Sequence, residues 1–167
     1  VKIIPFGVAQ ATVDAAVQQA SAAPLRVAAF RPRRVALIMT RLPQTSPALL
    51  EKTARVARQR LEPLGGELMA VRDCPHLEEP LSELIEEALR AGAELILVFG
   101  ASAIVDRRDV IPAALLRAGG EVLRLGMPVD PGNLLMLGRH DAVPVIGLPG
   151  CARSPKRNGL DMVLERL

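Results

Sequence analysis

The sequence predicts an α/β fold, a three-layer α/β/α sandwich with a mostly parallel sheet. Two observations lead to this prediction. Short apolar runs alternate with segments of helical periodicity through most of the chain. The run LILVF at residues 95–99 contains no polar residue, which is typical of a strand buried on both faces. Because half of the 167 residues are hydrophobic, the chain can also form a substantial core.

The chain is expected to divide into a strand–helix–strand extension over residues 1–31 and a main domain over residues 32–167. Within the extension, residues 1–8 and 24–30 have strand-like sequence. Residues 12–22 are rich in alanine, which favours a helix. The extension carries no motif, so its role is left open.

The main domain opens with a buried strand and a well-marked helix. Residues 35–39, VALIM, predict the strand. Ser46 and Pro47 predict the start of the helix, because a capping residue precedes a proline at the first helical position. The glycine pair at 65–66 ends this helix.

The later elements continue the alternation. A strand over residues 67–71 leads to Asp73, and apolar residues at helical spacing predict an amphipathic helix over 81–89 that ends at Gly92. Further elements are predicted at residues 113–118 (helix), 121–125 (strand), and 134–137 with 143–148, a hairpin split by a polar turn at 139–141.

Composition argues against several classes of partner. The chain has no Trp or Tyr and only three Phe, too few aromatic rings for stacking on single-stranded nucleic acid. No apolar run reaches the roughly 18 residues that a membrane helix needs. Cys74 and Cys151 form no CxxC pair and favour a reducing compartment. We therefore expect a cytoplasmic protein that binds neither nucleic acid nor membranes.

The last loop, over residues 150–159, is basic. It offers two helix starts, Ser154 with Pro155 or Asn158 with Asp161. Cations at a helix N-terminus are unfavourable by roughly 0.3–1 kcal/mol each, and a bound anion would reverse that cost. The loop therefore predicts a phosphate site, with a solvated basic loop as the alternative. The cations concerned are Arg153, Lys156 and Arg157.

Two aspartates are candidates for a shared crevice. Asp73 follows a strand, and Asp109 precedes a helix whose first turn holds Pro112, which puts Asp109 just outside the usual capping position. Two carboxylates suit Mg²⁺, which takes oxygen ligands beside substrate phosphates. Surface loop aspartates are the alternative, and Asp106 and Asp130 are weaker candidates.

A run of small residues, Gly100, Ala101 and Ser102, follows the central strand. It matches neither the P-loop nor the dinucleotide fingerprint. Its position matters more, because ligands of open α/β sheets bind outside the carboxyl ends of strands. The run Asp-Cys-Pro-His at residues 73–76 is not expected to bind a metal, since no second His or Cys cluster completes it.

Three segments occur in the order found in a known family. Residues 107–112, RRDVIP, are similar to its RRDVTP segment, residues 131–138 to its PGKP…G segment, and residues 148–154 to its LPGNPxS loop. Asp73 fits an aspartate that closes an earlier strand. Over residues 33–167 the chain therefore resembles the molybdopterin-binding domain (MoaB/Mog type) of molybdenum cofactor biosynthesis. This is the family of molybdopterin adenylyltransferase and the molybdenum-inserting transferase.

The resemblance is closest to a variant in which this domain precedes a molybdopterin cytidylyl- or guanylyltransferase domain. The opening VKIIPF and the segments at 99–113, 127–135 and 150–156 look like that variant. The chain begins in strand-like sequence and ends in a helical pattern, which agrees with a domain cut from such a fusion.

The resemblance implies that the domain binds molybdopterin or its nucleotide conjugate, with Mg²⁺ as a further cofactor. It implies catalytic or metal-binding roles for Asp73 and Asp109. The implied cofactor-binding residues lie in three loops and are Gly100, Ala101, Ser102, Arg108, Pro131, Gly132, Asn133, Pro149, Gly150, Arg153, Ser154 and Lys156.

The chain departs from the family at backbone-critical positions, with Ala101 and Ser102 at the glycine doublet and Cys151 and Ala152 in place of Asn-Pro. We therefore expect binding, with the ligand passed to a fused or associated nucleotidyltransferase. Nucleotidyl transfer or molybdenum insertion by the domain itself is the alternative. A third interpretation is a subunit-interaction domain, because the family's domains are often trimeric. A homo-oligomer, trimer or dimer, is expected.

Overall fold

The computed structural model describes residues 7–20 and 27–167. Helix α1 (Gln10–Ala20) confirms the helix predicted in the N-terminal extension, and none of its residues is buried. The strand expected over residues 1–8 lies mostly outside the described residues. The second expected strand is wrong in its described part, because residues 27–30 have no regular secondary structure. The division at residue 31 stays a prediction.

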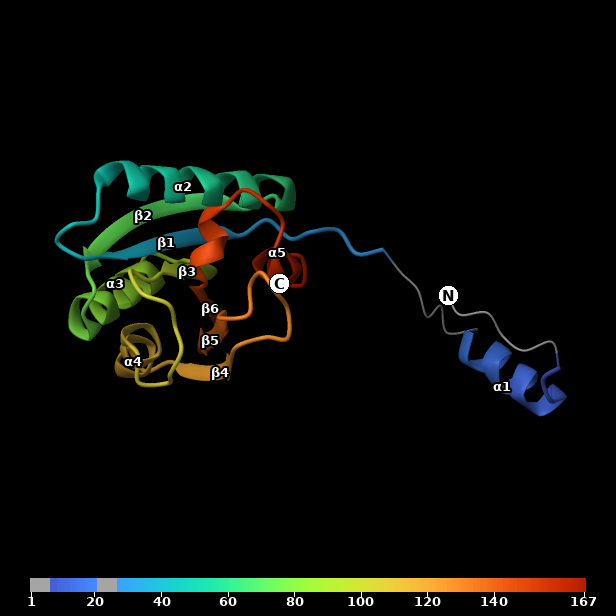
Figure 1. The fold of residues 1–167 in the computed structure, drawn as a ribbon. Coiled ribbons are helices and arrows are strands. Elements are labelled where there is room, and N and C mark those ends of the chain that lie inside the picture. Colours follow the sequence, from blue (N-terminus) through green and yellow to red (C-terminus); the bar gives the residue numbers. More distant parts are fainter. Residues whose placement is uncertain (1–6, 21–26) are drawn as a thin grey trace.

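The body is built on one six-stranded sheet of order β2-β1-β3-β6-β5-β4. The pairings among the first four strands of this order are parallel, and β5 pairs antiparallel with both neighbours. The predicted mostly parallel sheet is confirmed (Figure 1). The strands are β1 (Arg34–Arg41), β2 (Glu67–Pro75), β3 (Leu95–Phe99), β4 (Glu121–Leu125), β5 (Met136–His140) and β6 (Val143–Leu148).

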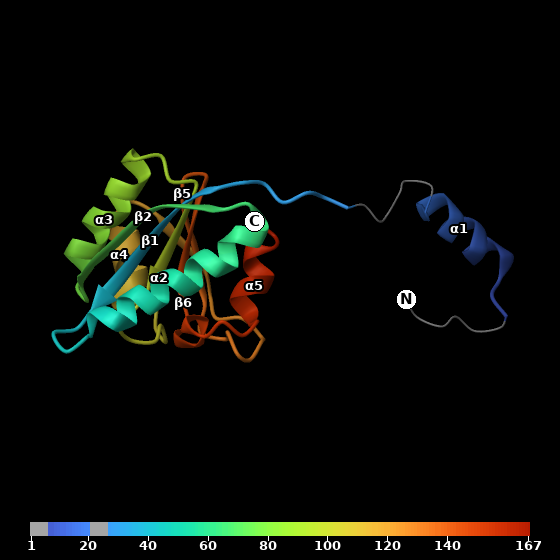
Figure 2. The same cartoon turned by 90° about the horizontal axis from the view of Figure 1, so that it is seen from above.

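Helices cover both faces of the sheet, which confirms the three layers (Figure 2). One core cluster lies between the sheet and α2 and α5, and a second lies between the sheet and α3 and α4. β3 contributes to both clusters and is buried at every residue, as its unbroken apolar run predicted. The helices are α2 (Pro47–Leu61), α3 (Glu78–Arg90), α4 (Val110–Arg117) and α5 (Gly159–Leu164), with short 3₁₀ helices η1 (Glu62–Leu64) and η2 (Gly150–Arg153).

Local signals set most helix boundaries. Ser46 caps α2, accepting from the backbone N–H of Leu49 at 3.4 Å, as predicted. The prediction that the glycine pair 65–66 stops this segment also holds, because Gly65 adopts a left-handed conformation with φ of 72°. The η1 turn lies between the end of α2 and Gly65.

The hairpin was predicted in the right place, but the bounds of its first strand and of its turn were wrong. β5 begins at Met136 and includes Arg139 and His140, which the sequence assigned to the turn. His140 pairs with Val143, so the connection shrinks to two residues. Asp141 takes a positive φ of 50° there, which a turn this tight requires.

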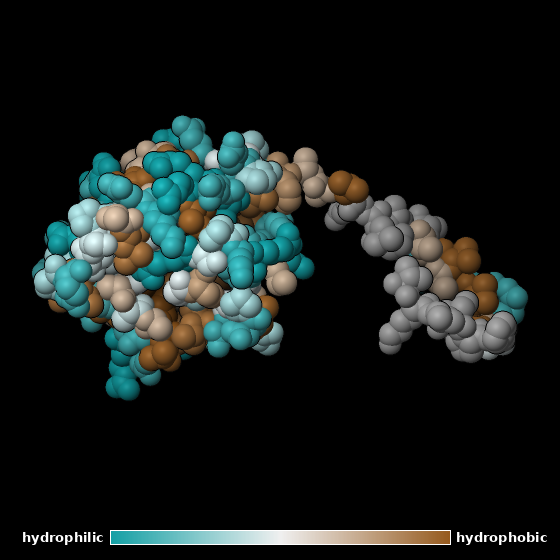
Figure 3. Space-filling model, turned by 45° about the horizontal axis from the view of Figure 1, so that its top comes forward, coloured by the Kyte–Doolittle hydropathy of each residue, from teal (hydrophilic) through white to brown (hydrophobic). Residues whose placement is uncertain are grey.

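The parallel strands β2, β1, β3 and β6 end at one edge of the sheet, which we call the carboxyl edge. In open α/β sheets, ligands bind in the crevice outside this edge. The face of the body in Figure 3 is largely hydrophilic, with small hydrophobic patches. Among the described helices, none has the length and apolar character needed to cross a bilayer.

Candidate functional site

A chain of hydrogen bonds links three parallel strands at the carboxyl edge. Thr40, buried near the end of β1, has its Oγ1 2.7 Å from Nδ1 of His76, which follows β2. Nε2 of the same ring lies 2.8 Å from Oγ of Ser102, which follows β3. The backbone N–H of Ala101 donates to Thr40 Oγ1 at 2.9 Å. The loop of small residues after β3 is therefore held by a neighbouring strand.

The sequence predicted a role for Ser102 but not for its two partners, Thr40 and His76. Thr40 is a polar residue directly after the apolar run at residues 35–39, a signal that points to a hydrogen bond near the strand's end. His76 was considered only as a metal ligand. Partial burial lowers the pKa of His76, and the Asp109 carboxylate nearby acts in the opposite direction.

Asp109 has a structural role that the sequence did not predict. It occupies the N-cap position of α4, rather than the position outside it, yet its side chain makes no capping bond. Its Oδ2 instead accepts the backbone N–H groups of Val105 at 2.7 Å and Asp106 at 2.9 Å. These two bonds lower the pKa of Asp109. The carboxylate closes the turn between β3 and α4.

Asp73 also has a partner. It lies within β2, which continues to Pro75, and its Oδ2 is 2.6 Å from Nε of Arg41 on β1. No group of three or more metal-ligating side chains occurs in the part of the chain that the structure describes. Because both Asp73 and Asp109 are already engaged, the pair is a poor match for Mg²⁺ in this arrangement. Magnesium binding stays a prediction.

Arg153, in η2 after β6, is a partly buried cation at this edge. Its Nη2 donates to the carbonyl of Gly100 at 2.8 Å, and its guanidinium lies 5.1 Å from the ring centre of Phe99. Its Nε is buried without a hydrogen-bond partner, and within the described residues it forms no ion pair. Burial lowers the pKa of Arg153. The loop after β6 thus contacts the loop after β3 through the Arg153 guanidinium, which has no counterion among the described residues.

Of the two predicted starts for the last helix, the structure contains the second. Asn158 caps α5 by accepting from the N–H of Leu160 at 3.0 Å, while Asp161 accepts from the N–H of Asn158 at 2.7 Å. This reciprocal capping box accounts for the buried position of Asn158. Ser154 is extended, and its Oγ accepts from the N–H of Lys156 at 3.3 Å.

Arg60 of α2 holds the basic loop in place. Its side chain is only 6% exposed, forms an ion pair with Asp161, and donates to the carbonyls of Ser154 at 2.6 Å and Lys156 at 3.0 Å. Sequence reasoning missed this role, because an arginine on an amphipathic helix is normally part of the solvated face.

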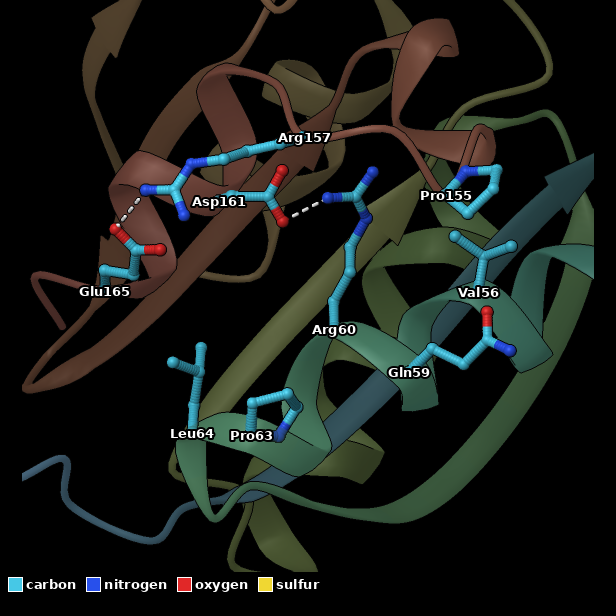
Figure 4. Close-up of a pocket in the computed structure, with 9 residues that line it drawn as sticks. All are labelled: Val56, Gln59, Arg60, Pro63, Leu64, Pro155, Arg157, Asp161 and Glu165. Atoms are coloured by element: carbon cyan, nitrogen blue, oxygen red, sulfur yellow. Dashed lines mark hydrogen bonds and ion pairs between the residues drawn. The ribbon is translucent and has the colours of Figure 1, made fainter.

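The ion pair of Arg60 and Asp161 lines a cavity of about 300 Å³ between α2 and the last loop, and Arg157 and Glu165 form a second ion pair in its wall (Figure 4). This cavity lies over the face of the sheet that α2 and α5 cover, and the carboxyl-edge residues described above do not line it. We treat it as separate from the candidate site.

The loop between β4 and β5 lies against the start of α5. The N–H of Gly159 donates to the carbonyl of Pro131 at 2.9 Å. Gly132 has φ of 125°, and a Cβ there would lie 2.7 Å from the nitrogen of Gly159. Glycine is required at this close approach. Asn133 is exposed, and its carbonyl accepts from the N–H of Met127 at 2.9 Å.

Contacts in the structure therefore connect the loops predicted to bind the ligand, two at a time. Gly100 meets Arg153, the loop at residues 130–132 meets α5, and Arg60 ties α5 to the basic loop. Pro149 and Gly150 lead into η2. Arg108 is apart from these contacts, since its side chain is 94% exposed and pairs with Asp106. The ligand-binding roles of all these residues stay predictions.

Burial raises the pKa of the Cys74 thiol to about 11, and the Asp73 carboxylate adds to this shift. Cys74 is buried among apolar residues, so it remains a protonated, unreactive thiol. Cys151 is half-buried in η2, beside Arg153.

Taken together, the mixed sheet, its two helix layers and the loops at the carboxyl edge define the MoaB/MogA type of α/β fold. No protein-family model matches the chain, and no curated protein matches its sequence. The structural likeness is to MoaB, a molybdopterin biosynthesis enzyme of Thermus thermophilus, with a TM-score of 0.57 and 20% identity over 81% of this chain and 91% of that one. At this identity the likeness shows the fold alone.

Two further structures are similar at lower scores. A tungsten cofactor synthesizing MoaB from Pyrococcus furiosus has a TM-score of 0.49 and 16% identity, covering 75% of this chain and 86% of its own. A MogA structure has a TM-score of 0.45 and 22% identity, covering 80% and 99%. The fold of the Thermus thermophilus MoaB agrees with the fold that the sequence resemblance implied.

Proposed function

We propose that this chain is a molybdopterin-binding domain that acts in molybdenum cofactor biosynthesis. Molybdopterin, or its nucleotide conjugate, would bind at the carboxyl edge. The observation that carries the proposal is Arg153, a partly buried guanidinium that has a carbonyl and a ring for neighbours but no carboxylate. A buried charge without a counterion is costly, and a bound anion would remove that cost.

The phosphate of the ligand is assigned to the loop after β6. Arg153 supplies the charge, and the exposed Lys156 in the same loop adds a second cation. The Ser154 hydroxyl accepts a backbone N–H and keeps its own hydrogen for a phosphate oxygen. Because Arg60 holds the carbonyls of Ser154 and Lys156, this loop is ordered before the ligand arrives.

The pterin ring is assigned to the loops beside it. A pterin edge carries N–H donors and carbonyl acceptors, so it needs both kinds of partner. Asp73 and Asp109 are acceptors at the ends of neighbouring elements, and the exposed Asn133 amide offers both a donor and an acceptor. The small side chain of the half-buried Ala101 lets the ring approach the backbone after β3.

Binding without catalysis is the form of the proposal that the contacts favour. Asp73 and Asp109, the carboxylates that would serve a metal-assisted transfer, are bound to Arg41 and to backbone N–H groups. The domain would then hand its ligand to a nucleotidyltransferase, fused or associated, and would do so as a homo-oligomer. Nucleotidyl transfer or molybdenum insertion by the domain itself remains the alternative.

Titration calorimetry with molybdopterin tests the proposal on wild type, Arg153→Met and Arg157→Met. Arg157 is a matched control, because it belongs to the same loop but pairs with Glu165. We expect binding by wild type and R157M and a loss of about 10-fold in R153M, the effect of one charge-assisted contact of about 1.4 kcal/mol.

Absence of binding by wild type, or equal binding by R153M, would refute the proposal. A parallel turnover assay with nucleotide and Mg²⁺ separates the two forms of the proposed function. Binding without turnover supports the module, and turnover at a rate that depends on Asp73 or Asp109 would replace it with the catalytic alternative.

A further inference from the structure

We propose that Ser102, His76 and Thr40 form a nucleophile, a general base and an orienting group, which together attack small carboxylic esters that carry a negative charge. This activity goes beyond molybdopterin binding, and it shares Ser102, Asp109 and Arg153 with the proposed ligand site. The base is within hydrogen-bond distance of the nucleophile at 2.8 Å, and the orienting group is within 2.7 Å of the base. This is the geometry that nucleophilic catalysis by a serine requires.

The proposal places the His76 proton on Nδ1, and the hydrogen bonds around Thr40 are compatible with that tautomer. A threonine hydroxyl has one hydrogen, and the carbonyl of Phe99 lies in its reach at 3.5 Å. Its oxygen already accepts from the N–H of Ala101. If the Thr40 hydroxyl donates its hydrogen to the carbonyl of Phe99, then His76 Nδ1 carries a hydrogen and donates it to Thr40 Oγ1 across the 2.7 Å contact. Nε2 is then bare and accepts the hydroxyl hydrogen of Ser102.

The surroundings of His76 suit a base. Partial burial favours the neutral ring in the resting protein. The carboxylate of Asp109 then favours the imidazolium that forms once the ring has taken a proton. Cys74, the other nucleophilic side chain near this edge, is buried and stays a thiol, so it does not compete with Ser102.

The position of Ser102 suits a nucleophile. Its side chain is exposed between the central strand β3 and helix α4, whereas the groups that orient it are half-buried or buried. Arg153 donates to the carbonyl of Gly100, two residues before Ser102. A negatively charged group on the substrate would therefore find a cation bound to the loop that carries the reacting hydroxyl, and from this we infer the class of ester.

The reaction balances without any further reagent than water. Ser102 Oγ attacks the ester carbonyl, the O–H bond breaks, and the proton moves to His76 Nε2 as the Oγ–C bond forms. The C–O bond to the leaving group then breaks, and His76 returns the proton to that oxygen. Water attacks the acyl-enzyme in the same way, releasing the acid and restoring the Ser102 hydroxyl.

The test uses the full chain and a biotinylated fluorophosphonate, which forms an Oγ–P bond while the P–F bond breaks and fluoride leaves with the serine proton. Intact mass and peptide mapping should show one adduct, on Ser102. Ser102→Ala should show none, and His76→Gln should react at least about 100-fold more slowly. Thr40→Val should also be slow, and Thr40→Ser should restore the rate.

The chain provides a matched control, because it has two histidines. His140→Gln should leave the labelling rate unchanged, and circular dichroism of every variant should match wild type. The proposal is overturned if folded wild type gives no adduct on Ser102, or if H76Q reacts at the wild-type rate. Nitrogen-15 shifts that place the His76 proton on Nε2 at neutral pH would overturn it as well.

Discussion

Arg60 and Arg153, two of the three partly buried arginines whose Nε lacks a partner among the described residues, have different electrostatic surroundings. Arg60, beneath the basic loop, has the carboxylate of Asp161 and two carbonyls as partners. Arg153, at the carboxyl edge, has one carbonyl and the face of Phe99. Each has an Nε buried without a partner. Arg60 therefore stabilises the fold through its ion pair, whereas Arg153 is the charge that the proposed function assigns to a ligand.

Breaking the ion pair of Arg60 and Asp161 should lower the free energy of unfolding more than any other change considered. Asp161→Ala leaves Arg60 buried without its counterion, which costs about 3–5 kcal/mol for a pair of this kind. It also removes half of the capping box on Asn158. Urea unfolding measured by circular dichroism gives the loss. Asp161→Asn, which keeps an acceptor for the cap, should lose less, and a wild-type midpoint in D161A would contradict this account of Arg60.

A substitution at the close contact of Gly132 with Gly159 should cause the next largest loss of stability. Gly132→Ala places a Cβ 2.7 Å from the nitrogen of Gly159 at a φ of 125°. Overpacking and backbone strain together should cost about 2–3 kcal/mol. Gly126→Ala is the control, since its φ is also positive, at 80°, but its Cβ would be 3.4 Å from the nearest atom. Equal thermal shifts in the two variants would show that the loop can move away from α5.

Removing the uncompensated charge should hardly affect the fold. Arg153→Met deletes a buried cation that has no carboxylate, so we expect a change of less than about 1 kcal/mol in the free energy of unfolding. Pyrophosphate should raise the melting temperature of wild type, and R153M should need about 10-fold more for the same shift. A loss of several kcal/mol without ligand would instead give Arg153 the structural role of Arg60.

The exposed ion pair in the cavity of Figure 4 should matter least. Glu165→Gln breaks the bridge to Arg157, whose side chain is 67% exposed, and surface pairs contribute about 0.2–1 kcal/mol. Unfolding in low and high salt measures this contribution. If E165Q were as damaging as D161A, burial would not explain the strength of the Arg60 pair.

The fold followed from the sequence where local chemistry is strong. The unbroken apolar run of β3, the cap at Ser46 and the stop at Gly65 each specify structure within a few residues. The bounds of the hairpin strands were harder, because a polar pair such as Arg139 and His140 fits the end of a strand as well as a turn.

The candidate site was less predictable, because its geometry depends on contacts between distant residues. The basic loop pointed to an anion through a helix dipole, yet α5 has only six residues and Arg153 lies in η2, before it. Burial of Arg153 against Phe99 is the stronger reason, and no local pattern shows it. The partnership of Thr40, His76 and Ser102 spans three strand ends and was missed for the same reason.

The long-range hydrogen bonds of Arg60 limit which fragments of this chain can be studied separately. One guanidinium on α2 binds carbonyls that lie 94 and 96 residues further along the chain. A shortened protein that begins after α2 would keep every loop motif and lose the side chain that shapes the last of them. Such fragments are unsuitable as minimal reagents, because the shape of the last loop depends on a helix that contains none of the loop motifs.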